Sequence, residues 1–175
     1  MDDAIAAWLE TERTRVESRI RSAFAGVSLA GGVSWTESMV LDGYGDHRDA
    51  IDARAADTES SWEALVDDAT RRPDCGVGGF NFLDPIGTRY YIAHAMIRAT
   101  HGAETANISF ALYFDPPPDA NDFRERKFAL LDSKQRRAIH SFLVFMILLD
   151  TVRGYESGQC DWIDCLAHHW GQFGE

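Results

Sequence analysis

Four polar side chains share one side of a helix that the sequence predicts in the middle of the chain. They are Tyr90, His94, Arg98 and His101. Their spacing of four, four and three residues places them on one face of a helix. A phenol, two imidazoles and a guanidinium could bind an anion or transfer protons there. The favoured interpretation, however, is a half-buried polar face that packs against the acidic segment. The candidate ligand face that we carry forward consists of Tyr90, His94 and Arg98 from this pattern together with the adjacent Arg89.

The C-terminal part of the chain holds the closest approach to a metal-ligand cluster. Its members are Cys160, Cys165, His168 and His169. Zinc requires thiolate and imidazole groups that converge tetrahedrally. On one helix these side chains would spread over about half the circumference, so they would meet on an ion only if the segment unwound. We therefore predict no metal ligands and no cofactor, and expect Cys165 to pack as a small apolar residue.

The motifs of the common hydrolases are missing from the sequence. It contains no G-x-S-x-G, no H-E-x-x-H and no C-x-x-C. The glycine-rich residues 76–79 lack the Lys-Ser/Thr pair of a phosphate-binding loop, so they indicate a turn. We name no catalytic residue, and the sequence favours a binding protein over an enzyme.

Charge is distributed unevenly along the chain. The formal net charge is -11, and between Glu37 and Asp74 eleven acidic residues stand against four arginines. From Arg124 to Arg137 six basic residues stand against two acidic ones, and we expect this stretch to complement the acidic one within the molecule. An acidic protein attracts basic partners and repels nucleic acid and anionic membranes. A solvated helical face is the alternative interpretation of the acidic stretch.

The residues predicted to contact a basic protein partner are the carboxylates of this acidic stretch. They are Asp46, Asp49, Asp52, Asp57, Glu59, Glu63, Asp67 and Asp68. Partner binding through them would be fast and would weaken with salt.

These side chains need a scaffold, and the apolar periodicity predicts a mainly α, compact, single-domain helical bundle over residues 1–175. At most one short strand or hairpin is expected, at about 108–114, where β-branched and aromatic residues gather. Asp84 and Pro85 predict a helix start, and so do Ser34 or Thr36, Asp46, and Asp132 or Ser133. The other expected helices cover 3–27, 47–57, 61–71, 133–153 and about 161–170.

The expected location is the cytoplasm. The chain starts with acidic residues where a signal peptide would be basic, and its three cysteines do not suggest a disulfide framework. The longest apolar run, residues 142–149, is far shorter than the roughly 20 residues that span a bilayer.

Several motifs together resemble an uncharacterised bacterial domain-of-unknown-function family. The main one is F-L-D-P-x-G-x-R-Y-Y at residues 82–91, and further matches are D-G-Y-G at 42–45, D-T-E at 57–59 and F-A-L-L at 128–131. The matches span about residues 34–147, in family order. The resemblance implies a bacterial cytoplasmic protein with a helical core and supplies no activity or catalytic residue.

Small size, acidity and the lack of catalytic motifs lead to one functional expectation. We expect an immunity-type or other inhibitor protein that neutralises a basic toxin or effector by stoichiometric binding. A small-ligand-binding protein or enzyme that uses the candidate ligand face is the alternative. A homodimer is a further candidate because Trp162, Trp170 and Phe173 make the C-terminal segment rich in aromatic residues.

Overall fold

Helices form the whole of the secondary structure in the computed structural model, which describes residues 2–57, 61–67, 79–102, 106–114, 122–154 and 156–174. The elements are α1 (Asp3–Ala23), α2 (Trp35–Asp42), α3 (His47–Ala56), α4 (Trp62–Asp67), α5 (Gly79–Phe82), α6 (Pro85–Thr100), α7 (Ala106–Leu112), α8 (Asp122–Lys127), α9 (Ser133–Arg153), α10 (Glu156–His168) and the 3₁₀ turn η2 (Trp170–Phe173). The predicted mainly α fold is confirmed. No helix in these ranges is long and apolar enough to cross a membrane.

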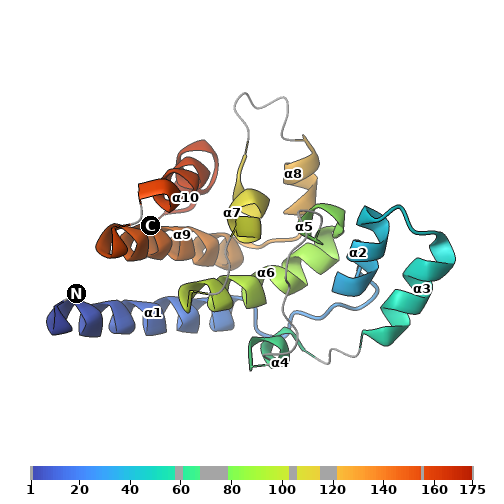
Figure 1. The fold of residues 1–175 in the computed structure, drawn as a ribbon, viewed down its shortest axis with the longest axis horizontal. Helices are drawn as coiled ribbons and strands as arrows, with labels where there is room; N and C mark the ends of the chain where they lie inside the picture. The colour runs from blue at the N-terminus through green and yellow to red at the C-terminus, as the bar shows by residue number, and fades with distance from the viewer. Residues whose placement is uncertain are drawn as a thin grey trace.

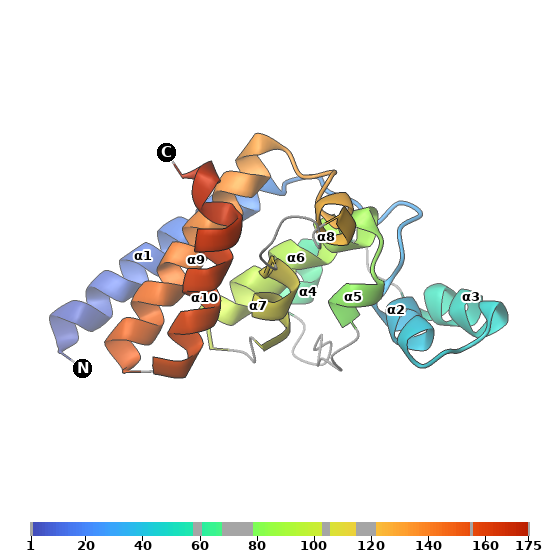
Figure 2. The same ribbon diagram turned by 90° about the horizontal axis from the view of Figure 1, so that it is seen from above.

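Three long helices lie side by side at one end of the molecule. The antiparallel helices α1 and α9 pack together, and α10 covers the other side of α9 (Figures 1 and 2). Helix α6 lies in the middle and packs against α1, α4, α7, α8 and α9. At the opposite end α2 and α3 form a helical hairpin that is joined to the body through α2 and α5. We call residues 34–57 the acidic hairpin.

The core is built around α6 and α9. Helix α6 buries eleven of its sixteen residues, many more than the apolar stripe of a surface helix would supply. The run at 142–149, predicted to be central, contributes Phe142, Leu143, Phe145, Met146 and Leu149 to the same core. Helix α6, which buries most of its circumference, and α9, which supplies these five side chains, therefore fix the positions of the elements packed against them.

Helix starts follow the capping residues as predicted. The Asp84 carboxylate accepts a hydrogen bond from the backbone N–H of Gly87 at 2.7 Å, with Pro85 as the first helical residue. Ser34, Asp46 and Asp132 each form a capping box at the start of α2, α3 and α9. The sequence therefore predicts these four helix starts correctly.

Asp84 also fixes the segment that joins α1 to α2. Its Oδ1 atom accepts a second hydrogen bond, from the backbone N–H of Val33 at 3.0 Å. Val33 thereby crosses closely over the first turn of α6, and its carbonyl oxygen would lie 2.4 Å from a Cβ atom at Gly87. Only glycine fits at residue 87 without a shift of one backbone against another.

Gln135 links three helices from a buried position. Its Oε1 atom accepts hydrogen bonds from Arg89 Nε at 3.1 Å and from the Asp132 N–H at 3.2 Å, while its Nε2 atom donates to the Ala23 carbonyl at 3.2 Å. The side chain therefore ties the end of α1 and the side of α6 to the first turn of α9.

The strand expected at 108–114 is wrong, because most of this segment is the helix α7. A strand needs a neighbouring strand to satisfy its backbone, and the described ranges contain none, whereas a helix satisfies its own. Ile108, Ala111 and Leu112 are buried, and α7 packs against α5 and α10. Two helices also differ in extent from the prediction. Helix α1 ends at Ala23 rather than at residue 27, and α10 spans Glu156–His168 rather than about 161–170.

Three cations of the basic stretch, which was expected to complement the acidic stretch, bond to backbone carbonyls. Arg124 donates to the carbonyl of Phe110 at the end of α7, and Arg136 donates to the carbonyls of Phe128 and Leu131. Buried Lys127 donates to the Phe80 carbonyl, and burial together with the charge of Arg124 lowers its pKa to about 8. These cations satisfy the carbonyl ends of helices and turns, where positive charge is favoured.

Candidate functional site

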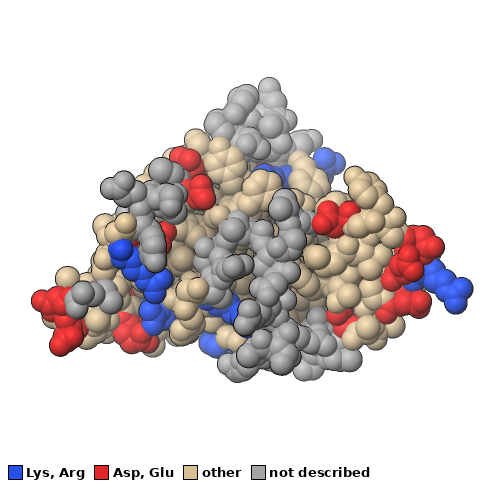
Figure 3. Space-filling model, in the orientation of Figure 1, with Lys and Arg blue, Asp and Glu red and all other residues tan. Residues whose placement is uncertain are grey.

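The acidic hairpin projects from the end of the molecule. Residues 34–57 contain six carboxylates and two arginines, a net charge of -4. In Figure 3 acidic side chains cover the right-hand end, over α2 and α3, and a second acidic group covers the start of α1. The hairpin therefore carries a negative field on a protruding element, where it acts on an approaching partner with little screening by the body.

Most carboxylates of the hairpin also hold its helices together. Asp46 accepts from the N–H groups of Arg48 and Asp49, and Asp49 accepts in return from the Asp46 N–H. Asp57 accepts from both the N–H and the hydroxyl of Thr36, at 3.1 and 2.6 Å, and so joins the end of α3 to the start of α2. These carboxylates cap or join helices, so they serve the stability of the hairpin as well as its surface charge.

The remaining predicted partner-binding residues are more dispersed. Asp52 is exposed on α3, and no capping contact involves it. Glu63 is half-buried on α4, a separate element, and Asp67 is the last residue of α4. Glu59 and Asp68 lie outside the described residues. The structure thus groups Asp46, Asp49, Asp52 and Asp57 on one element and sets Glu63 apart.

Tyr44 stands out at the tip of the acidic hairpin. Its side chain is 97% exposed, and it is the one described non-glycine residue with a positive φ, at 57°. Ile51, on the outer face of α3, is 54% exposed. A bulky residue in the left-handed region is strained, and a fully exposed aromatic ring gains nothing from the core. In the sequence this tyrosine lies between two glycines, a pattern that by itself indicates only a turn.

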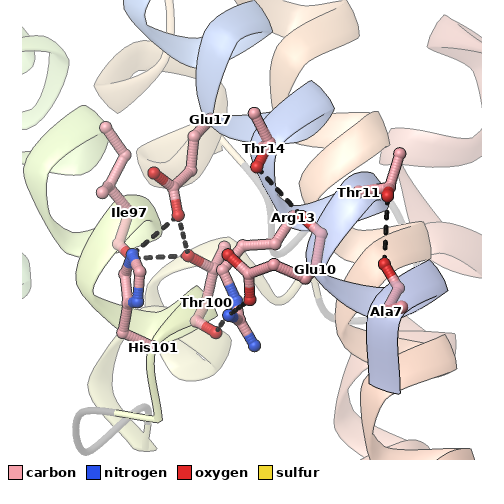
Figure 4. Close-up of polar contacts among 9 residues, drawn as sticks. All are labelled: Ala7, Glu10, Thr11, Arg13, Thr14, Glu17, Ile97, Thr100 and His101. Atoms are coloured by element: carbon pink, nitrogen blue, oxygen red, sulfur yellow. Dashed lines mark hydrogen bonds and ion pairs between the residues drawn. The ribbon is translucent and has the colours of Figure 1, made fainter. Parts of the chain in front are cut away.

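The candidate ligand face does not form one exposed surface. Tyr90 and His94 are buried, Arg98 is half-buried, and Arg89 points to Gln135. The fourth residue of the pattern, His101, pairs with Glu17 of α1 at 2.8 Å. Figure 4 shows this contact beside the Thr100 hydroxyl, which donates to Glu17, and Arg13, which donates to the Thr100 carbonyl. The pattern predicted from spacing is therefore distributed between the core and the α1–α6 contact.

His94 is a neutral imidazole inside the core. Its ring nitrogens have no hydrogen bond of ordinary geometry among the described residues, and the backbone of Leu65 gives only a weak one. Burial, and to a lesser degree the charge of Arg98, lower the pKa of His94 to about 4. Two cavities found in the described parts of the chain lie between α1 and α9, away from His94.

His94 should make the protein sensitive to acid. At pH values between 6.5, the ordinary pKa of histidine, and about 4, the pKa of His94 in the folded protein, His94 binds a proton in the unfolded chain but not in the folded protein. The free energy of unfolding therefore falls as pH falls through this window, by about 2 kcal/mol at pH 5. His94→Leu should remove this part of the loss, which urea unfolding at pH 7 and pH 5 would measure. His47→Gln, on the exposed surface of α3, is the control. Equal pH dependence in the wild type and His94→Leu would contradict the assignment.

One comparison with known proteins identifies the family. A model described as "Family of unknown function (DUF6714)" matches residues 12–173. The chain belongs to the DUF6714 family. The match reaches beyond residues 34–147, the span of the motif resemblance, and takes in most of α1 and the C-terminal segment. No curated protein and no solved structure matches the chain.

The DUF6714 match includes the Cys/His segment, whose described side chains point to different surroundings. Cys165 is buried and donates to the Ser109 carbonyl, and burial raises its pKa to about 12. His169 stacks on Phe114 with ring centroids 3.7 Å apart, whereas His168 is exposed beside Tyr113. No three potential metal ligands converge within the ranges that the structure describes. Trp162 and Trp170 are buried, so they offer no exposed aromatic surface for a dimer.

Proposed function

We propose that this protein is a cytoplasmic inhibitor of the immunity type, which binds a basic toxin or effector one to one through the acidic hairpin. The observation that carries the proposal is Tyr44, a strained and fully exposed aromatic residue at the tip of a protruding acidic element. Strain of this kind persists where a residue is kept for binding rather than for folding.

The hairpin combines the features of a protein-binding surface. Tyrosine is among the residues that most often dominate interface energy, and Ile51 adds apolar area on the same hairpin. The net charge of -4 around them would steer a cationic partner and set the orientation of encounter. A projecting hairpin can also enter a cleft, such as the active site of an enzyme, which a flat surface cannot.

The test separates binding from stability at residue 44. Glycine adopts a positive φ without strain, so Tyr44→Gly should leave the free energy of unfolding unchanged or raise it by about 0.5–1 kcal/mol. The same substitution removes the aromatic anchor and should weaken partner binding by about 30-fold, the effect of losing a residue worth about 2 kcal/mol. The partner would be captured from the native host with the wild-type protein, identified and purified, and its Kd measured by calorimetry.

Charge is tested with Asp52, which caps no helix. Asp52→Lys should slow association and reduce its dependence on salt, while Glu125→Lys makes the same charge change on exposed α8 and should do neither. The proposal fails if Tyr44→Gly binds the captured partner as tightly as the wild type does. It also fails if Asp52→Lys and Glu125→Lys have equal effects on association.

A further inference from the structure

A groove runs between the antiparallel helices α1 and α9, on a different part of the molecule from the acidic hairpin. It consists of two adjoining cavities of about 300 and 330 Å³, and both are lined by Arg15, Arg19 and Arg137. Their combined size falls within the range of small-molecule sites. The groove is thus large enough for one organic ligand that extends along both helices.

The two ends of the groove differ in chemistry. One end is lined by the three arginines together with Lys134, Ser18, Ser22 and Ala23, and it contains no carboxylate. The other end adds an apolar part to its lining, next to Glu12, His140 and Ser141. This part consists of Val16, Val144, Phe145, Leu148 and Phe173. Cations and hydroxyls are the groups that bind phosphate, whereas the apolar end suits an aromatic or aliphatic body.

The groove carries positive charge in a chain whose net charge is -11. Four cationic side chains line it against one carboxylate, Glu12, which pairs with Arg15 at 3.0 Å. Lys134 and Arg137 make no side-chain hydrogen bond or ion pair with any other described residue. Positive charges gathered in a groove raise the local concentration of anions and favour the binding of an anion there.

The basic residues beside the groove have different surroundings. Arg136, next to Arg137, is bonded to the carbonyls of Phe128 and Leu131 and so has a structural partner. Arg19 donates to the Ser141 hydroxyl at 2.6 Å, which holds its guanidinium across the groove from α1 to α9. The basic run of α9 is therefore divided between cations that cap backbone carbonyls and cations that face the groove.

We propose that the α1–α9 groove binds a soluble organic phosphate of about the size of a nucleotide. Its phosphates lie among Arg15, Arg19, Lys134 and Arg137, and its apolar body lies against Phe145, Leu148 and Phe173. Arginine suits this task because its guanidinium group donates two parallel hydrogen bonds to phosphate oxygens. The site is independent of the proposed partner binding, since it shares no residue with the acidic hairpin.

Calorimetric titration of the full chain at low salt, with three probes, tests the proposal. ATP should bind most tightly, inorganic tripolyphosphate about tenfold more weakly because it lacks an apolar body, and adenosine not measurably. Equal affinity for ATP and tripolyphosphate would overturn the two-part site, and an absence of ATP binding would overturn the proposal altogether. Binding to phosphatidylserine vesicles but not to ATP would likewise overturn it, in favour of a lipid surface.

Two matched double variants place the site. Lys134→Ala with Arg137→Ala should weaken ATP binding at least tenfold, which corresponds to about 1.4 kcal/mol. Arg21→Ala with Arg48→Ala removes the same two charges from exposed positions outside the groove and should change the affinity less than twofold. Leu148→Asn, which adds no charge to the groove, should weaken ATP binding and leave tripolyphosphate binding nearly unchanged. The proposal is overturned if both double variants weaken ATP binding equally, because the effect would then be one of net charge alone.

Discussion

Gly87→Ala should lower the free energy of unfolding by about 3 kcal/mol, because the added methyl group would meet the backbone of another segment. The new Cβ atom would lie 2.4 Å from the Val33 carbonyl oxygen and 3.1 Å from Asp84 Oδ1. Neither neighbour is a flexible side-chain end, because Val33 contributes backbone and Asp84 is held by two hydrogen bonds. Relief would require the α1–α2 connection to move away from α6. Urea unfolding monitored by circular dichroism would measure the loss.

Gly43→Ala is the matched control for this prediction. Gly43 ends α2 with a φ of -76°, which any residue adopts, and its Cβ atom would meet nothing closer than 3.5 Å. Alanine at residue 43 should change the free energy of unfolding by less than about 1 kcal/mol, because it also restricts the unfolded chain. Similar losses in both variants would show that the close approach at Gly87 does not limit stability.

Gln135→Leu should cost about 3 kcal/mol although leucine has nearly the same volume. The substitution removes the partners of Arg89 Nε, the Asp132 N–H and the Ala23 carbonyl in one step. A buried polar group that loses its partner costs about 1–3 kcal/mol, and water can reach the half-buried Arg89 only in part. The loss should appear as a lower urea midpoint with an unchanged slope, because the fold itself is retained.

The control for Gln135 is Gln172, whose side chain makes a single local hydrogen bond on the surface. Its Nε2 atom donates to the His169 carbonyl at 3.0 Å, and the residue is exposed. Gln172→Leu should change the free energy of unfolding by less than about 0.5 kcal/mol. A small effect of Gln135→Leu, comparable with that of Gln172→Leu, would mean that Gln135 does not stabilise the junction of α1, α6 and α9.

The sequence predicts well those features that depend on a few neighbouring residues. Asp84, Ser34, Asp46 and Asp132 were identified as helix starts because a cap acts over only three residues. The close approach of Val33 to Gly87 could not be predicted in the same way. It joins residues more than fifty positions apart, so the glycine in the D-P-x-G motif looked like part of the helix start alone.

The strand predicted at 108–114 was wrong because a weak local preference was taken to decide the structure. β-branched and aromatic residues favour strands weakly, and the contacts that α7 makes with α5 and α10 override that preference. The candidate ligand face was a correct helical pattern whose surroundings were unknown. Spacing placed Tyr90, His94 and Arg98 on one side of α6, but it could not show that α4 and α1 cover that side.

The candidate surfaces could be located from the sequence only in part. Local charge in the sequence located the acidic hairpin, although it could not distinguish carboxylates that cap helices from Asp52, which does not. The groove could not be predicted from the sequence, because Arg15 and Arg19 lie more than a hundred residues from Lys134 and Arg137. They meet only because α1 and α9 pack in an antiparallel pair.

The way the acidic hairpin is attached has a consequence for how such proteins diverge. Helix α3 buries a single residue, Ala50, whereas α6 buries eleven. Substitutions on the outer face of α3 therefore leave the core unaffected, and selection on the surface of this helix is separated from selection on the fold. Lineages can then change the outer surface of α3 step by step while the helical body is inherited almost intact.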